Sequence, residues 1–306
     1  MNGTIIDADH GIRLAYEELG DPAGAPLILI AGLGMQLHSW PDGFCELLTH
    51  RGYRVIRFDN RDCGRSTHLD YPPPGPLAML GKHWHPGQYT LADMAADTVG
   101  LLDALEVPAA HLAGVSMGGM IAQTVAARYP GRVRSLTSIM STTGGRRVGR
   151  PALSTWRRML ARPSRDQAEA ADRTVRMFRH IGSAGFPFDE PWWREYASRA
   201  WDRDPTSAGT GRQLAAIIRS GDRTAELRSM TIPTLVIHGD HDLMVHPSGG
   251  AATQRAIPGA RLETIKGMGH DLPSQVWPRV AGLIDSHIRV ADSGRAVRGS
   301  DDGQKS

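Results

Sequence analysis

A serine between two glycines, at residues 114–118, is the stretch best suited to covalent chemistry. The order Gly-Val-Ser-Met-Gly follows an apolar run over residues 109–115 and precedes a helical pattern over residues 120–129. This context predicts a strand, a sharp turn and a helix, with Ser116 exposed at the turn as a nucleophile elbow. Because glycine has no Cβ, the strand and the helix can approach closely around the serine. The Met117 N–H would then lie at a helix N-terminus, where it can stabilise developing negative charge.

Partners for such a serine occur further along the chain. A serine hydroxyl is a weak nucleophile at neutral pH and needs a base, a task suited to histidine. His270 lies in a glycine-flanked loop after the last strand pattern, and either Asp240 or Asp242, after an earlier strand pattern, could orient its imidazole. Because each of these residues follows a strand, all can meet at one edge of a sheet. The order Ser116, Asp, His270 is one of the three known serine-triad orders, so we predict a catalytic triad.

Alternating strand and helix patterns predict the scaffold that positions these residues. Two short strand patterns near the N-terminus precede six apolar runs, at residues 26–30, 53–58, 109–115, 133–140, 234–237 and 261–265. Continuous apolar runs are typical of strands buried on both faces of a parallel sheet. Helical patterns lie between most of the runs, which predicts a doubly wound α/β sheet with helices on both faces.

The alternation stops over residues 141–220, where helical patterns occur without a convincing strand. We therefore expect a core of residues 1–140 and 221–290, with an inserted helical cap at 141–220 whose last helix could belong to the core. The insertion carries Trp156, Met159, Met177, Phe178, Phe186, Phe188, Trp192, Trp193 and Trp201. Most of these side chains should form the core of the insertion, and the remainder should line an apolar pocket.

Three further segments carry weaker patterns. The charged loop at residues 59–66 could be solvated, could form a buried and internally paired turn beside the site, or could act directly through Asp59 or Asp62. Residues 71–88 are rich in Pro, Gly and His and are expected to lack regular structure. The polar segment 291–306 shows no apolar periodicity and is expected to be disordered.

The composition of the chain limits which binding partners and which cellular compartment we expect. The 306-residue chain has a formal net charge of +3 and 41% hydrophobic residues, so bulk charge indicates neither nucleic acid nor a membrane surface as partner. Two cysteines cannot form a disulfide framework, and we see no secretory signal or membrane-spanning run, so we expect a cytoplasmic protein. The histidines near residues 68–85 lack ligand spacing, so no metal site is expected. No oligomeric state is predicted.

Several short segments resemble a known family. They are Trp40-Pro41-Asp42, Val55-Ile56-Arg57, Arg61-Asp62, Gly64-Arg65-Ser66-Thr67, Gly185 with Pro187-Phe188-Asp189, and Gly267-Met268-Gly269-His270 followed by Leu272-Pro273-Ser274. These segments are similar to those of cap-bearing actinobacterial esterases that include the aclacinomycin methylesterases, within the α/β-hydrolase superfamily. The resemblance implies an α/β-hydrolase fold with an eight-stranded sheet and a helical cap. It also implies ester hydrolysis without a cofactor and a triad of Ser116, Asp242 and His270, the acid being the aspartate a few residues before Pro247.

The loop after the first long strand bears on the reaction class. It reads Ala-Gly-Leu-Gly at residues 31–34, and its Leu33 N–H is expected to join the Met117 N–H as the second oxyanion donor. The loop lacks the His-Gly-Gly-Gly run of hormone-sensitive-lipase-like esterases. Serine rather than aspartate at the elbow argues against the chemistry of haloalkane dehalogenases and epoxide hydrolases.

The function predicted from the sequence is a serine hydrolase that cleaves a carboxylic ester of a hydrophobic small molecule through an acyl-enzyme. A methyl ester of a polyketide-type metabolite is one candidate substrate. Two alternatives use the same triad, namely carbon–carbon bond hydrolysis and cofactor-free perhydrolysis. A third is a ligand-binding protein on this fold without catalysis.

Overall fold

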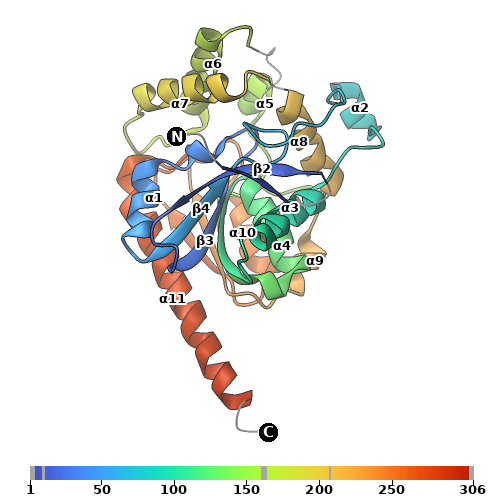
Figure 1. Ribbon diagram of the computed structural model, residues 1–306. Coiled ribbons are helices and arrows are strands. Elements are labelled where there is room, and N and C mark those ends of the chain that lie inside the picture. Colours follow the sequence, from blue (N-terminus) through green and yellow to red (C-terminus); the bar gives the residue numbers. More distant parts are fainter. Residues whose placement is uncertain (1–3, 9–10, 160–163, 207, 303–306) are drawn as a thin grey trace.

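Eight strands form one twisted sheet in the computed structural model (Figure 1), which describes residues 4–8, 11–159, 164–206 and 208–302. The strands are β1 (Thr4–Asp7), β2 (Arg13–Leu19), β3 (Ala25–Ile30), β4 (Tyr53–Phe58), β5 (Ala110–Val115), β6 (Val133–Ile139), β7 (Thr234–Gly239) and β8 (Arg261–Ile265). They lie in the order β1-β2-β4-β3-β5-β6-β7-β8. Strand β2 runs antiparallel to β1 and β4, and the other neighbouring strands run parallel. The predicted eight-stranded, mostly parallel sheet is confirmed.

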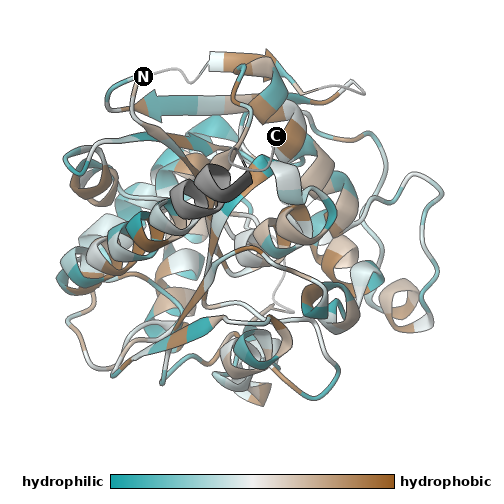
Figure 2. Ribbon diagram, turned by 90° about the horizontal axis from the view of Figure 1, so that it is seen from below, coloured by the Kyte–Doolittle hydropathy of each residue, from teal (hydrophilic) through white to brown (hydrophobic). Residues whose placement is uncertain are grey.

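Helices cover both faces of this sheet (Figure 1). On one face lie α1 (Asp42–Thr49) and α11 (Trp277–Asp302); on the other lie α3 (Leu91–Ala104), α4 (Met117–Arg128), α9 (Thr224–Arg228) and α10 (Ser248–Ala256). Helical ribbons in Figure 2 carry both brown and teal segments.

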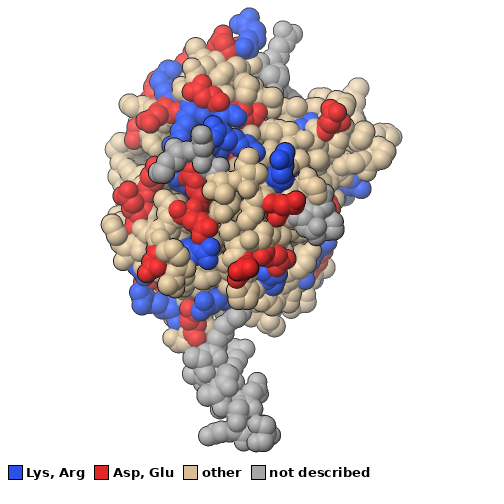
Figure 3. Space-filling view, viewed as in Figure 1, with Lys and Arg blue, Asp and Glu red and all other residues tan. Residues whose placement is uncertain are grey.

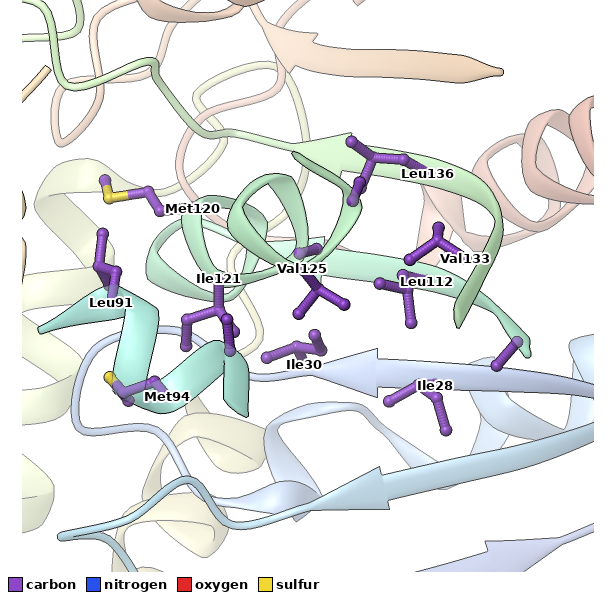
Figure 4. Close-up of a cluster of buried hydrophobic side chains, with 14 of the residues drawn as sticks. Ile28, Ile30, Leu91, Met94, Leu112, Met120, Ile121, Val125, Val133 and Leu136 are labelled. Atoms are coloured by element: carbon purple, nitrogen blue, oxygen red, sulfur yellow. The ribbon is translucent and has the colours of Figure 1, made fainter. Parts of the chain in front are cut away.

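The two faces of strand β3 show why its sequence is apolar without interruption. Leu27 and Leu29 belong to the core cluster with α1 and α11, whereas Ile28 and Ile30 belong to the cluster with α3 and α4. Successive side chains of a strand point to opposite faces, and here both faces are buried. Figure 4 shows Ile121 of α4 lying over Ile30.

Helix α3 begins where the sequence predicts. The Thr90 side chain accepts a hydrogen bond from the Ala92 N–H, and the Asp93 carboxylate accepts one from the Thr90 N–H at 2.7 Å. This reciprocal arrangement is a capping box, which satisfies N–H groups that have no partner within the helix.

A short helix α2 (Pro76–Gly81) interrupts the segment 71–88, so the prediction of no regular structure there is wrong. Pro76 is the first helical residue, a position that its fixed φ favours, and the residue directly after the helix, Lys82, has a positive φ of 56°. Leu77 and Leu80 are 84% and 83% exposed. Because the helix buries no apolar face, the sequence shows no apolar stripe that would predict it.

The insertion between β6 and β7 holds α5 (Leu153–Met159), α6 (Gln167–Ile181), α7 (Glu190–Arg203) and α8 (Ala208–Ser220), and its described residues contain no strand. Helices α5, α6 and α7 lie together beyond one edge of the sheet (Figure 1). We propose that residues 141–220 form a cap on a core of residues 1–140 and 221–290. Helix α8 buries Ala216 in the cluster of α3 and α4, which ties the end of the insertion to the core.

The closing helix extends into the segment that we expected to be disordered. Helix α11 continues to Asp302, Ala291 is only 4% exposed, and an Asp292 carboxylate oxygen lies 2.8 Å from an Arg134 guanidinium nitrogen. The prediction of disorder from residue 291 is therefore wrong for residues 291–302, because Ala291 continues the apolar stripe of Ile284 and Ile288. Residues 303–306 lie outside the described part of the chain.

Surface charge is mixed in sign on the face shown in Figure 3, where basic and acidic side chains are interspersed. Across the residues that the structure describes, no helix combines the length and apolar character needed to cross a membrane. The same residues include no group of three His, Cys, Asp or Glu side chains placed to hold a metal ion.

The first prediction concerns the end of α11. Deleting residues 291–306 should lower Tm by about 1–3 °C, because it removes a buried alanine and an ion pair that together contribute about 1 kcal/mol. Deleting residues 295–306 keeps both groups and should change Tm by less than about 1 °C. Differential scanning calorimetry of both truncated proteins checks this, and equal Tm values for the two would show that Ala291 and Asp292 do not stabilise the fold.

Candidate active site

The nucleophile elbow forms where β5 ends and α4 begins. Ser116 has φ 56° and ψ −117°, a conformation that non-glycine residues rarely adopt. A Cβ on Gly114 would lie 2.2 Å from the Gly118 carbonyl oxygen, and a Cβ on Gly118 would lie 2.1 Å from the Ile30 carbonyl oxygen. Both positions therefore require glycine. The Ser116 N–H donates to the Ile139 carbonyl at 2.9 Å, which holds the turn in place.

The structure brings the predicted serine, histidine and one aspartate together. The His270 Nε2 atom lies 3.0 Å from the Ser116 Oγ, and its Nδ1 atom lies 2.7 Å from the Asp242 Oδ2. His270 is 8% exposed and Asp242 is 2% exposed, so little water competes for these hydrogen bonds. With an Nδ1–H donated to Asp242, the Nε2 atom can accept the serine proton, as a general base requires.

Asp242 is held as a carboxylate by several donors. Its Oδ1 accepts the N–H groups of Met244 and Val245, each at 2.8 Å. Burial on its own raises the pKa of Asp242, but the charge of His270 and hydrogen bonds from His238 and His270 outweigh burial and lower the pKa to about 2. Asp242 therefore stays ionised at neutral pH and can stabilise an imidazolium.

Asp240, the other aspartate considered as a partner for His270, contacts His241 and Gly267 instead. It is exposed, and its Oδ1 lies 2.6 Å from the His241 Nδ1 and accepts the Gly267 N–H at 2.6 Å. These contacts steady the loop after β8. The geometry thus separates two aspartates that follow the same strand.

A second histidine contacts the acid and was missed in the sequence. His238 is 1% exposed, and its Nε2 lies 2.8 Å from the Val245 carbonyl oxygen and 3.4 Å from the Asp242 Oδ2. It stands at the end of β7, four residues before Asp242. The short spacing between His238 and Asp242, at the end of one strand and in the loop after it, is the sequence feature that could have predicted this contact.

The two expected oxyanion donors belong to segments that adjoin the serine. A Cβ on Gly32 would lie 3.5 Å from the Ser116 Cβ, so the loop with Leu33 passes directly against the elbow. The next N–H, that of Gly34, donates to the Gln213 Oε1 at 2.8 Å. Within the described residues, neither the Leu33 N–H nor the Met117 N–H donates a hydrogen bond, so both can bind an oxyanion.

Buried ion pairs hold the charged loop at residues 59–66. Asp59 is fully buried, accepts the Leu37 N–H at 2.7 Å and is paired with Arg203 of α7. Asp62 accepts two hydrogen bonds, at 2.6 and 2.8 Å, from the Arg212 guanidinium of α8. Of the three alternatives, the buried turn comes nearest, but its two carboxylates pair with arginines of the insertion and not within the loop.

The partners of this loop were not predicted. Arg203 and Arg212 lie more than a hundred residues further along the chain. Gln213, also fully buried, joins the loop after β3 to the charged loop, because its Oε1 accepts the Gly34 N–H and its Nε2 donates to the Arg61 carbonyl, each at 2.8 Å. Arg57, Arg61 and Arg65 are nearer to these aspartates in the sequence, so the sequence did not signal that distant arginines pair with them.

Aromatic residues of the insertion reach the loop after β3. Trp193 and Tyr196, each 7% exposed, cluster with Phe178, whose ring stacks on Trp193 at a centroid distance of 3.4 Å. Met35 packs against this cluster, and its Cγ would lie 3.8 Å from a Cβ on Gly32. Met35 therefore connects the aromatic cluster to the neighbourhood of the serine.

Other aromatic residues of the insertion lie elsewhere. Trp156 is 38% exposed, and Phe186 packs against the core cluster of α1 and α11. A cavity of about 390 Å³ has Phe178 and Phe188 in its lining, together with Asp242 and Leu243 of the loop after β7. Asp242 lines the cavity, but neither Ser116 nor His270 does.

Comparison with known proteins agrees with this geometry. The family model described as alpha/beta hydrolase fold matches residues 25–274. The chain is 33% identical to the rhodomycin D methylesterase DnrP of Streptomyces peucetius, over 94% of this chain and 99% of that protein. It is 32% identical to the rhodomycin D methylesterase DauP of Streptomyces sp. (strain C5), over 95% and 99%. The structure of a hydrolase from Pseudomonas aeruginosa PA01 superposes with a TM-score of 0.68 at 26% identity, over 95% and 98% of the two chains.

The family predicted from short segments is thus confirmed by a match over most of the chain. Relatives, sheet topology and elbow geometry agree on one assignment. The chain belongs to the α/β-hydrolase family.

Proposed function

We propose that the protein is a serine esterase that hydrolyses a carboxylic ester of a hydrophobic small molecule through an acyl-enzyme. The observation that carries this proposal is the position of His270, hydrogen-bonded at 3.0 Å to Ser116 and at 2.7 Å to Asp242. Similarity to two methylesterases over nearly the whole chain supports the same reaction class.

The reaction follows from these positions. Ser116 Oγ attacks the ester carbonyl while its proton passes to the His270 Nε2. The oxygen of the tetrahedral intermediate accepts hydrogen bonds from the Leu33 and Met117 N–H groups. His270 then gives its proton to the departing alcohol, and Asp242 stabilises the imidazolium in the meantime. Water attacks the acyl-enzyme by the same steps and releases the acid.

The substrate that we propose is the methyl ester of a polyketide-type metabolite. The relatives DnrP and DauP are named as rhodomycin D methylesterases. A methyl ester leaves a small alcohol, so the bulk of the substrate lies on the acyl side. Aromatic side chains that contact Met35 next to the serine offer an apolar surface for a large acid.

The nucleophile is tested by Ser116→Ala. We expect this variant to fold with an unchanged Tm, to lose labelling by a fluorophosphonate probe and to lose about 10⁴- to 10⁶-fold in kcat. The measurements are ester kinetics, gel fluorescence of the probe and circular dichroism. Turnover within tenfold of wild type would end the proposal of a serine esterase.

The acid is tested by Asp242→Asn with Asp240→Asn as its matched control. An amide at position 242 can donate where His270 needs an acceptor, which favours the wrong imidazole tautomer and should lower kcat by about 10⁴-fold. Asp240→Asn keeps an acceptor for the Gly267 N–H and should stay within about threefold of wild type. Kinetics of both variants on one ester decide the matter, and the reverse pattern would assign the acid to Asp240.

The apolar surface is tested with a series of acyl chains. From acetate to hexanoate esters of one phenol, kcat/KM should rise by up to about fourfold per CH₂, the equivalent of about 0.8 kcal/mol. Met35→Ala should reduce this slope, whereas the exposed Trp156→Ala should leave it unchanged. A preference for acetate in wild type, or faster turnover of a diketone than of any ester, would contradict the proposed substrate class.

A further inference from the structure

The turn between α6 and α7, at residues 181–185, lies against the loop that carries His270. The His270 N–H donates to the Ile181 carbonyl at 2.7 Å, and the Gly185 N–H donates to the Gly267 carbonyl at 2.9 Å. The backbone of the histidine is thus bonded to the insertion, although the loop belongs to the core in sequence.

Glycines on both sides allow this contact. A Cβ on Gly269 would lie 2.2 Å from the Gly182 carbonyl oxygen, and a Cβ on Gly185 would lie 2.6 Å from the Gly267 Cα. Separations of this size exclude any side chain at Gly269 and Gly185 without movement of the backbone. The two segments therefore touch along several residues, with little freedom to shift relative to each other.

Ser183 bonds to both chain neighbours of His270. Its Oγ accepts the Gly269 N–H at 2.9 Å and donates to the Asp271 Oδ1. One hydroxyl can do both, since it has one proton to donate and two lone pairs to accept with. Residues 269, 270 and 271 are therefore all hydrogen-bonded to residues 181 and 183 of the turn.

We propose that Ser183 is a positioning residue for His270. By holding Gly269 and Asp271, its hydroxyl keeps the imidazole where one nitrogen meets Ser116 and the other meets Asp242. Both of those contacts are at hydrogen-bond distance, 3.0 and 2.7 Å, so a small movement of the loop lengthens at least one of them. The inference rests on the proposed function and adds that the insertion takes part in aligning the base as well as covering the site.

The test compares Ser183→Ala with Ser183→Thr, which keeps the hydroxyl. We expect Ser183→Ala to lower kcat and the rate of fluorophosphonate labelling together by about tenfold, with KM within about twofold, because a displaced base slows the chemical step. Ser183→Thr should recover most of the loss. Ser154→Ala is the matched control, since it also removes a hydroxyl of the insertion. The Ser154 side chain is exposed on α5, and its Oγ lies 3.1 Å from the His180 Nε2, so its removal should leave kcat unchanged.

A double-variant cycle tests the same hydrogen bond without relying on Ser183→Thr, whose extra methyl group has to fit at position 183. Asp271→Ala removes the other partner of the same hydrogen bond, so the combined Ser183→Ala and Asp271→Ala protein should lose less than the product of the single effects. Tm is measured for every variant.

Three results would overturn the positioning role. They are Ser183→Ala with kcat within twofold of wild type, a loss of kcat that Ser154→Ala shares, and a loss that appears in KM and Tm rather than in kcat. In each case an inactive Ser116→Ala leaves the proposed function intact, whereas an active Ser116→Ala refutes the proposed function itself.

Discussion

Close contact between the start of α4 and the carboxyl ends of β3 and β5 is the constraint on which the site depends. Side chains are excluded at Gly114 and Gly118 because carbonyl oxygens lie only 2.2 and 2.1 Å from where their Cβ atoms would be. The same contact brings the loop after β3 against Ser116, so one packing arrangement aligns the proposed nucleophile with the proposed oxyanion donors. The positive φ of Ser116 costs about 1–3 kcal/mol, which burial of Met117 and Ile121 in the core offsets.

The second constraint is electrostatic. Asp59 and Asp62 are both buried, and an unpaired buried carboxylate costs several kcal/mol. Their guanidinium partners, Arg203 and Arg212, come from helices α7 and α8 of the insertion. The core therefore needs the insertion to neutralise these charges. For this reason the insertion is better described as part of the framework of the site than as a separate lid.

Short sequence patterns made the sheet and the nucleophile elbow predictable from the sequence. The elbow needs glycines at fixed positions, and buried parallel strands need continuous apolar runs, so both can be recognised within a few residues. The choice between Asp240 and Asp242 could not be made from residue types, because both follow β7. It depends on where the N–H groups of Met244 and Val245 point.

Three features were not predicted, because the residues that determine them lie far away in the chain or show no apolar pattern. The partners of Asp59 and Asp62 lie more than a hundred residues away in the chain, and only the folded structure pairs them. Helix α2 buries no apolar face, so periodicity does not predict it. In α11 the apolar stripe continues past residue 290 by a single alanine, Ala291, which is too little to distinguish from a polar tail.

The central claim is that ester hydrolysis passes through an acyl group on the serine of the elbow. It is tested most directly by acid-quenching the wild-type protein during turnover of an activated aryl ester and measuring the intact mass, followed by peptide mapping. The account predicts a mass increase of one acyl group per chain, located on Ser116. Turnover without an acyl adduct, or an adduct on a different residue, would contradict it.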